Sequence, residues 1–163
     1  MTTETFQVRD GARVVTFDGV KLGEISSRRP TSPRWTDMIL YRTATDKYVL
    51  SKIGRTTVLH QPGCPSVYSR LKRFVDEHPG VEPDEAEWEL HTCIPDEYDL
   101  NEILVEQTRY WAVIADHARD VIQNLYRNQD GVKFLPRMAV NLLEDAALRD
   151  KDLADAFYVE KVT

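Results

Sequence analysis

Two histidines and two cysteines are the residues whose types and spacing best suit chemistry in this sequence. They form two short pairs, His60 with Cys64 and His91 with Cys93. On a strand, residues i and i+2 project from the same face, so His91 and Cys93 can bind one ion together. A Gln-Pro-Gly turn can fold His60 and Cys64 together. Two thiolates and two imidazoles form a tetrahedral zinc set, so the four residues predict a zinc site.

Cys64 also supports a second chemistry, that of a thiol nucleophile. Pro65 suits the first position of a helix, which makes Cys64 the N-cap, where the helix dipole lowers the pKa of a thiol. With His60 or His91 as base, this is the outline of a cysteine-dependent enzyme. No orienting third group follows from the sequence, so we assign no catalytic residue. The alternative is structural, with both cysteines as small buried hydrophobes and both histidines as ordinary polar residues.

A basic loop with an adjacent aromatic residue is the next candidate. Arginines contact phosphates and an indole stacks on unpaired bases, so the loop predicts nucleic-acid binding. Together with the zinc set it would make a small zinc-stabilised nucleic-acid-binding module. A solvated loop is the simpler interpretation, because the chain is acidic overall and lacks a basic recognition helix. The residues concerned are Arg28, Arg29, Arg34 and Trp35.

Charge is strongly segregated along the chain. Residues 1–75 carry thirteen Lys or Arg against six Asp or Glu, whereas residues 76–106 carry twelve acids and no Lys or Arg. Such a row of acids can bind a protein with a basic cleft, by complementary potential and steered association. It can equally be a solubilising surface, or a partner for the basic half of the same chain. The acids that we expect to contact a partner are Glu82, Asp84, Glu85, Glu87 and Glu89.

Length and composition predict one globular domain over residues 1–163. The chain has 42% hydrophobic and 29% charged residues and a net charge of −6, which are ordinary values for such a domain. No run approaches the ~20 apolar residues of a membrane span, and the first ten residues lack a secretory apolar segment. Two cysteines fit a reducing compartment. We therefore expect a cytoplasmic protein with no membrane partner, and the sequence predicts no oligomeric state.

The pattern of apolar residues predicts an α+β fold: an N-terminal antiparallel β-meander, one later buried strand, and C-terminal helices packed on the sheet. Residues 1–64 are β-rich, 65–106 hold a helix and the acidic loop, and 107–163 hold a strand and three helices. Asp18-Gly19 predicts a hairpin turn, and Asp116 predicts an N-cap. The expected strands are 13–17, 20–25, 37–43, 47–53, 56–60, 88–93 and 108–115. The expected helices are 66–77 and three more, which carry apolar stripes within residues 118–125, 135–146 and 153–158.

The first half of the chain, and more loosely its helical tail, resembles a group of small actinobacterial and actinophage proteins with no established function. The resemblance rests on Trp35, Leu40-Tyr41-Arg42-Thr43, Tyr48-Val49, Gly54-Arg55-Thr56, Val58, His60 and Cys64. It implies a cytoplasmic protein, from a phage or mobile element, and no catalytic residues.

These observations favour a non-enzymatic interaction protein, a regulator or inhibitor that presents its acidic surface to a macromolecular partner. The zinc-stabilised nucleic-acid-binding module and the cysteine-dependent enzyme are the alternatives. No Walker loop, G-x-G-x-x-G, G-x-S-x-G or H-E-x-x-H motif is present, which disfavours nucleotide-dependent and common hydrolytic chemistry.

Overall fold

The computed structural model describes residues 2–57, 76–77, 79–80 and 108–159. The chain divides into two units. The larger comprises residues 1–28, 36–54 and 109–163, and the smaller comprises residues 29–35 and 55–108. The sheet core, the helices of the described residues 108–159 and the candidate site belong to the larger unit.

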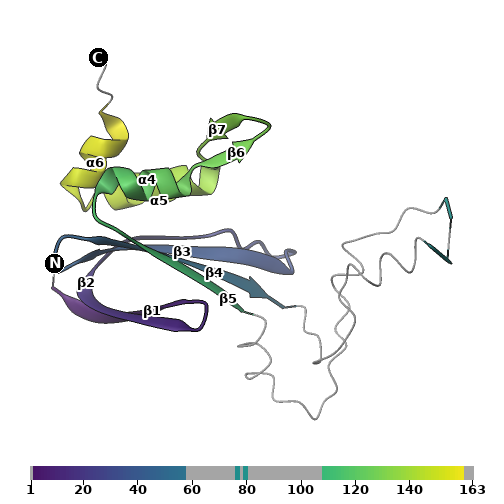
Figure 1. Ribbon diagram of the computed structural model, residues 1–163, viewed down its shortest axis with the longest axis horizontal. Coiled ribbons are helices and arrows are strands. Elements are labelled where there is room, and N and C mark those ends of the chain that lie inside the picture. Colours follow the sequence, from purple (N-terminus) through teal and green to yellow (C-terminus); the bar gives the residue numbers. More distant parts are fainter. Residues whose placement is uncertain (1, 58–75, 78, 81–107, 160–163) are drawn as a thin grey trace, which may run out of the picture. The chain divides into compact units, whose positions relative to one another are not determined.

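Within the described residues, five strands form one sheet in the order of the chain, which confirms the predicted meander and the later strand (Figure 1). Its first and last strands meet at one end, where Gly11 N donates to Tyr110 O at 2.9 Å and Ala112 N donates to Asp10 Oδ1 at 3.3 Å. The sheet therefore curls into a half-barrel. The strands are β1 (Glu4–Asp10), β2 (Arg13–Ser26), β3 (Arg34–Thr43), β4 (Tyr48–Thr56) and β5 (Arg109–Ala115).

The inside of the half-barrel holds the smaller of the two apolar cores that the described residues form. Alternate residues of each strand point inward, as the pleat requires, and three aromatic rings pack together there. The ring of Tyr41 lies 4.7 Å from that of Phe6 and 5.2 Å from that of Phe17. Edge-on and tilted pairs at this spacing are favourable for aromatic side chains. The buried residues of this core are Val8, Tyr41, Val49 and Ala112.

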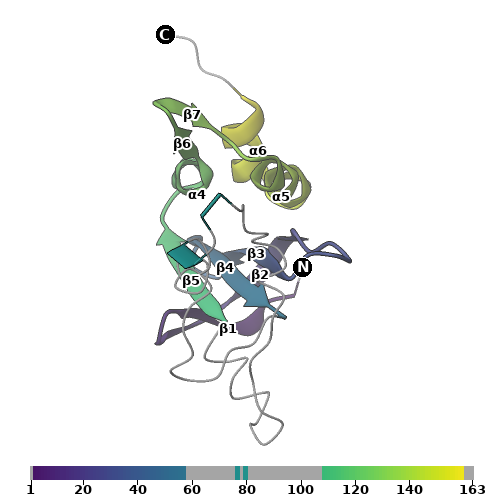
Figure 2. The ribbon, with the colours of Figure 1, turned by 90° about the vertical axis from the view of Figure 1, so that its right-hand side faces the viewer.

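In the described part of the chain, three helices cover the other face of the sheet, which confirms the α+β fold (Figures 1 and 2). They are α4 (Ala118–Leu125), α5 (Arg137–Ala147) and α6 (Lys151–Tyr158), and a small hairpin of β6 (Arg127–Gln129) and β7 (Val132–Phe134) joins α4 to α5. The apolar stripes of the helices meet the sheet and form the larger core. Its fully buried residues include Leu40 and Leu50 from the sheet and Leu142, Leu143 and Leu153 from the helices.

The expected turn at Asp18-Gly19 is wrong. Strand β2 continues through both residues, and the turn between β1 and β2 lies at Gly11, whose φ is +61°. Gly19 is needed for a different reason: a Cβ atom there would lie 2.3 Å from the carbonyl oxygen of Arg42. A close approach of β3, and not a turn, therefore accounts for this glycine.

Other boundaries also differ from those expected. Strand β4 continues through Gly54 to Thr56, so the expected break between two strands there is wrong. Helix α4 has His117 as its N-cap in place of Asp116, and no side chain caps it. Strand β1 and the β6–β7 hairpin were not expected. The expected helix at 66–77 and strand at 88–93 lie largely or wholly outside the described residues.

A buried polar network attaches α6 to the sheet. Asp150 is 5% exposed and caps α6 by accepting from Leu153 N at 3.0 Å. Its carboxylate also accepts from Tyr48 Oη at 2.6 Å and from the guanidinium of Arg42. Arg42 donates further to Asp152 at 2.7 Å. The positive charge of Arg42 is thus paired with the negative charges of Asp150 and Asp152, as a buried charge requires.

Candidate anion-binding site

The helix-facing side of the sheet ends in polar residues at the end opposite the Asp150 network. Along β4, Tyr48 and Leu50 point toward the helices and lie in the core, and Lys52 follows them on the same face. Lys52 lies opposite Trp111 of β5 in the strand register. The apolar helix-facing side of β4 therefore ends at Lys52, next to the start of α5.

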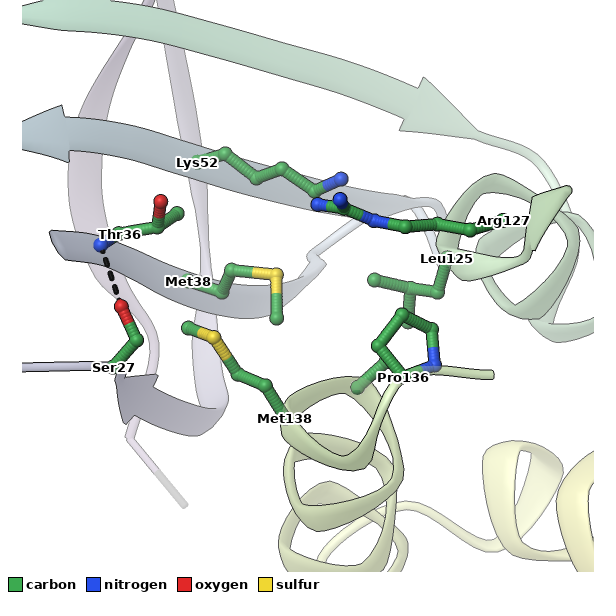
Figure 3. A pocket seen from close by; sticks show the side chains of 9 residues that line it. Ser27, Thr36, Met38, Lys52, Leu125, Arg127, Pro136 and Met138 are labelled. Atoms are coloured by element: carbon green, nitrogen blue, oxygen red, sulfur yellow. Dashed lines mark hydrogen bonds between the residues drawn. The ribbon is translucent and has the colours of Figure 1, made fainter. Parts of the chain in front are cut away.

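A cavity of about 220 Å³ opens at this place. Figure 3 shows the side chains of Lys52 and Arg127 pointing toward one another across it, with the two methionine side chains below them. Its lining joins the sheet to α4, to β6 and to the first turn of α5. The residues that give it its character are Ser27, Thr36, Met38, Lys52, Arg127 and Met138.

The two cations of this cavity have no acidic partner in the described part of the chain. Among the residues that the structure describes, neither Lys52 nor Arg127 forms an ion pair with a carboxylate. Arg42, on the same side of the sheet, has ion pairs to Asp46, Asp150 and Asp152. Counting the described residues alone, one end of the face is neutralised and the other has an excess of positive charge.

The surroundings of Lys52 disfavour its charged ammonium form. Partial burial lowers the pKa of Lys52, and the neighbouring positive charge of Arg127 lowers it further. The indole of Trp111, whose ring centre is 4.6 Å from Lys52 Nζ, gives some compensation by a cation–π contact. An anion in the cavity would offset the repulsion between Lys52 and Arg127 and give the ammonium a partner of opposite charge.

The cavity combines groups that together recognise a particular kind of ligand. Two cations and the hydroxyls of Ser27 and Thr36 can donate to a carboxylate or phosphate. Ser27 Oγ accepts from Thr36 N at 2.8 Å, which fixes its orientation and leaves its proton to donate. Met38, Met138 and Leu125 supply an adaptable apolar wall. The site therefore suits an anionic group carried on an apolar stem.

The lowered pKa leads to a reactivity prediction. At pH 8, Lys52 should be methylated by limiting formaldehyde and cyanoborohydride before Lys151, because a larger fraction of Lys52 is unprotonated. A hydrogen bond to Asp155 raises the pKa of exposed Lys151. Peptide mapping by mass spectrometry measures both rates. Arg127→Ala should slow the reaction of Lys52 by raising its pKa, and an unchanged rate would show that Arg127 does not act on it.

Two of the three candidate sites from the sequence fall on residues that the structure does not describe. The zinc residues His60, Cys64, His91 and Cys93, and the acids Glu82, Asp84, Glu85, Glu87 and Glu89, lie outside the described residues. In the described part of the chain, no group of three or more His, Cys, Asp or Glu is placed to hold a metal ion.

The basic loop is described. Arg28, Arg29 and Arg34 are exposed and Trp35 is half-buried. Arg28, Arg34 and Trp35 each have interaction partners within the protein. Arg28 belongs to the larger unit and the other three to the smaller, so the structure does not establish a joint site.

Two other hollows are less informative. One, of about 340 Å³, lies at the open end of the half-barrel beside Phe17, Val49 and Ile114. The other, of about 620 Å³, is wide and shallow, and its charges are mixed, with His117 and Arg119 beside Asp152 and Asp155. Both hollows are lined by acidic as well as basic side chains, so neither is a site for a ligand of one charge.

Comparison with protein-family models, with curated proteins and with solved structures found no match to this chain. The resemblance to actinobacterial and actinophage proteins therefore stays a prediction. None of the helices within residues 2–57 and 108–159 is long and apolar enough to cross a membrane. The evidence for function is thus the geometry of the site itself.

Proposed function

We propose that this chain is a non-enzymatic binding protein that holds an anionic group of its ligand between Lys52 and Arg127. The observation that carries the proposal is the convergence of two cations, unpaired among the described residues, on one cavity of about 220 Å³. Hydrogen bonds to charged groups contribute about 1.5–3 kcal/mol each. Two such cations and an apolar wall would favour a small amphipathic anion over a neutral molecule of the same shape.

The proposal keeps the interaction function expected from the sequence and adds a basic binding site. The acidic residues 82–89 were expected to meet a basic partner, and that remains a separate prediction. A ligand for the Lys52 cavity has the opposite charge. The zinc-dependent and cysteine-dependent alternatives depend on residues outside the described part of the chain, so they stay predictions.

Thermal unfolding with matched six-carbon probes tests the proposal. Hexanoate should raise the melting temperature, because a ligand that binds only the folded state stabilises it by mass action. Neutral 1-hexanol, of the same length, should have a much smaller effect, and hexylammonium should have none.

The hexanoate effect should also depend on pH between 6 and 10. The probe is ionised throughout this range, whereas Lys52 loses its charge as the pH rises through its lowered pKa. Binding should therefore weaken toward high pH. An equal shift with hexanoate and 1-hexanol, or a hexanoate shift that grows with pH, would refute an anion site.

A further inference from the structure

The β6–β7 hairpin presents apolar side chains beside the cationic cavity. Strand pairing places Arg127 opposite Phe134 and Gln129 opposite Val132. Paired residues in an antiparallel ribbon point to the same side, as do residues two apart along a strand. Arg127, Phe134 and Val132 therefore share one face of the hairpin.

The opposite face of the hairpin is turned toward α4. Lys133 Nζ donates to Gln123 Oε1 at 3.0 Å and lies 5.3 Å from the ring centre of Tyr126. The hairpin turn is also well defined, because Asp130 and Gly131 both have positive φ and Gly131 N donates to Asn128 Oδ1 at 3.0 Å. These contacts present the Arg127 face as a preformed surface.

The apolar residues of that face are uncovered. Val132 is 64% exposed and Phe134 is 36% exposed. Phe134 is paired with Arg127, and Val132 lies about 7 Å further along the hairpin, toward its turn. The apolar strip therefore extends away from Arg127. A molecule of the size of the cavity would fill the pocket and leave this strip in water. Exposed apolar surface next to unpaired charge is typical of a protein-binding site.

We propose that the ligand of the Lys52 cavity is the docking segment of an acidic partner protein. A carboxylate side chain of this segment enters the cavity between Lys52 and Arg127, and a large apolar side chain close to it in sequence covers Val132 and Phe134. This inference rests on the proposed function. It adds the class of partner and a second contact that a small anion does not make.

Selection from a displayed library of random twelve-residue peptides tests the inference. The selected peptides should share Asp or Glu within about two residues of Phe, Leu, Ile or Trp. A synthetic consensus peptide should bind wild-type protein and lose about tenfold or more in affinity with V132S/F134S, as measured by fluorescence anisotropy. The same variant should bind hexanoate normally, because its changes lie outside the cavity. Leu148→Ser is the matched control, since Leu148 is 81% exposed and lies beyond α5.

The outcomes separate this inference from the proposed function. Normal hexanoate binding with selected peptides that lack an acid, or that bind V132S/F134S unchanged, would overturn the inference alone. The inference would also be overturned if the library yielded no binding peptide and a dodecathymidine oligonucleotide bound through Lys52 and Arg127. A wild-type protein that fails to bind hexanoate would overturn the proposed function, and the inference with it.

Discussion

Replacing Asp150 by alanine should lower the free energy of unfolding by about 3 kcal/mol. The carboxylate is 5% exposed and accepts from three donors at once, on Arg42, Tyr48 and Leu153. Its loss would leave the buried Tyr48 hydroxyl without an acceptor and α6 without its N-cap. Removing one partner of a buried charge pair costs about 3–5 kcal/mol. Arg42 keeps Asp152, so we expect the lower end of that range.

Urea denaturation, with thermal melting as a second measure, tests this prediction. Asp152→Ala is the matched control, because Asp152 also pairs with Arg42 but its side chain is 62% exposed. Exposed ion pairs contribute about 0–1 kcal/mol, so that variant should remain near wild type. If the two variants lose equal stability, the network around Asp150 does not hold α6 to the sheet.

Replacing both Lys52 and Arg127 by methionine should reduce hexanoate affinity about tenfold or more, with little loss of folding stability. Each cation is expected to donate a charge-assisted hydrogen bond to the bound carboxylate, and about 1.4 kcal/mol corresponds to a factor of ten. Stability should be kept, because neither side chain has an ion pair among the described residues and methionine retains most of the apolar stem. Isothermal titration calorimetry measures the affinity.

The control removes two charges elsewhere. Lys47 and Lys151 pair with Asp116 and Asp155 on the surface and line no part of the cavity. K47M/K151M therefore makes the same change in net charge without changing the site. Equal losses of affinity in the two double variants would point to a general effect of charge, and not to a site at Lys52 and Arg127.

The fold was largely predictable because its cores follow simple periodicities. Alternation along β3 and β4, and the stripe containing Leu142 and Leu143, identify the faces that become buried. Turns were less predictable, and the tetrapeptide Asp-Gly-Val-Lys shows why. At 18–21 it lies within β2, where β3 approaches Gly19 closely, and at 130–133 it forms a hairpin turn with two positive φ angles. Local preference is the same at both places, and the neighbouring strand decides the outcome.

The candidate site was partly visible in the sequence. Lys52 follows Tyr48 and Leu50 at alternate positions, so it falls on a face that is otherwise apolar, which is a signal of unusual placement. Arg127 carries no such signal, because its position depends on a hairpin of two three-residue strands that is too short to produce a pattern. The network of Asp150 with Arg42 joins residues 108 positions apart, and no local rule predicts that contact.

Methionine methyl resonances give the most direct test of the anion site. The chain has three methionines, and Met38 and Met138 both line the cavity. In protein labelled with carbon-13 at the methionine methyl groups, hexanoate should shift the resonances of Met38 and Met138 saturably and leave that of Met1 unchanged. The shifts should be absent in K52M/R127M and much smaller with 1-hexanol. Unshifted Met38 and Met138 resonances in wild-type protein at saturating hexanoate, or equal shifts with 1-hexanol, would contradict an anion-binding site between Lys52 and Arg127.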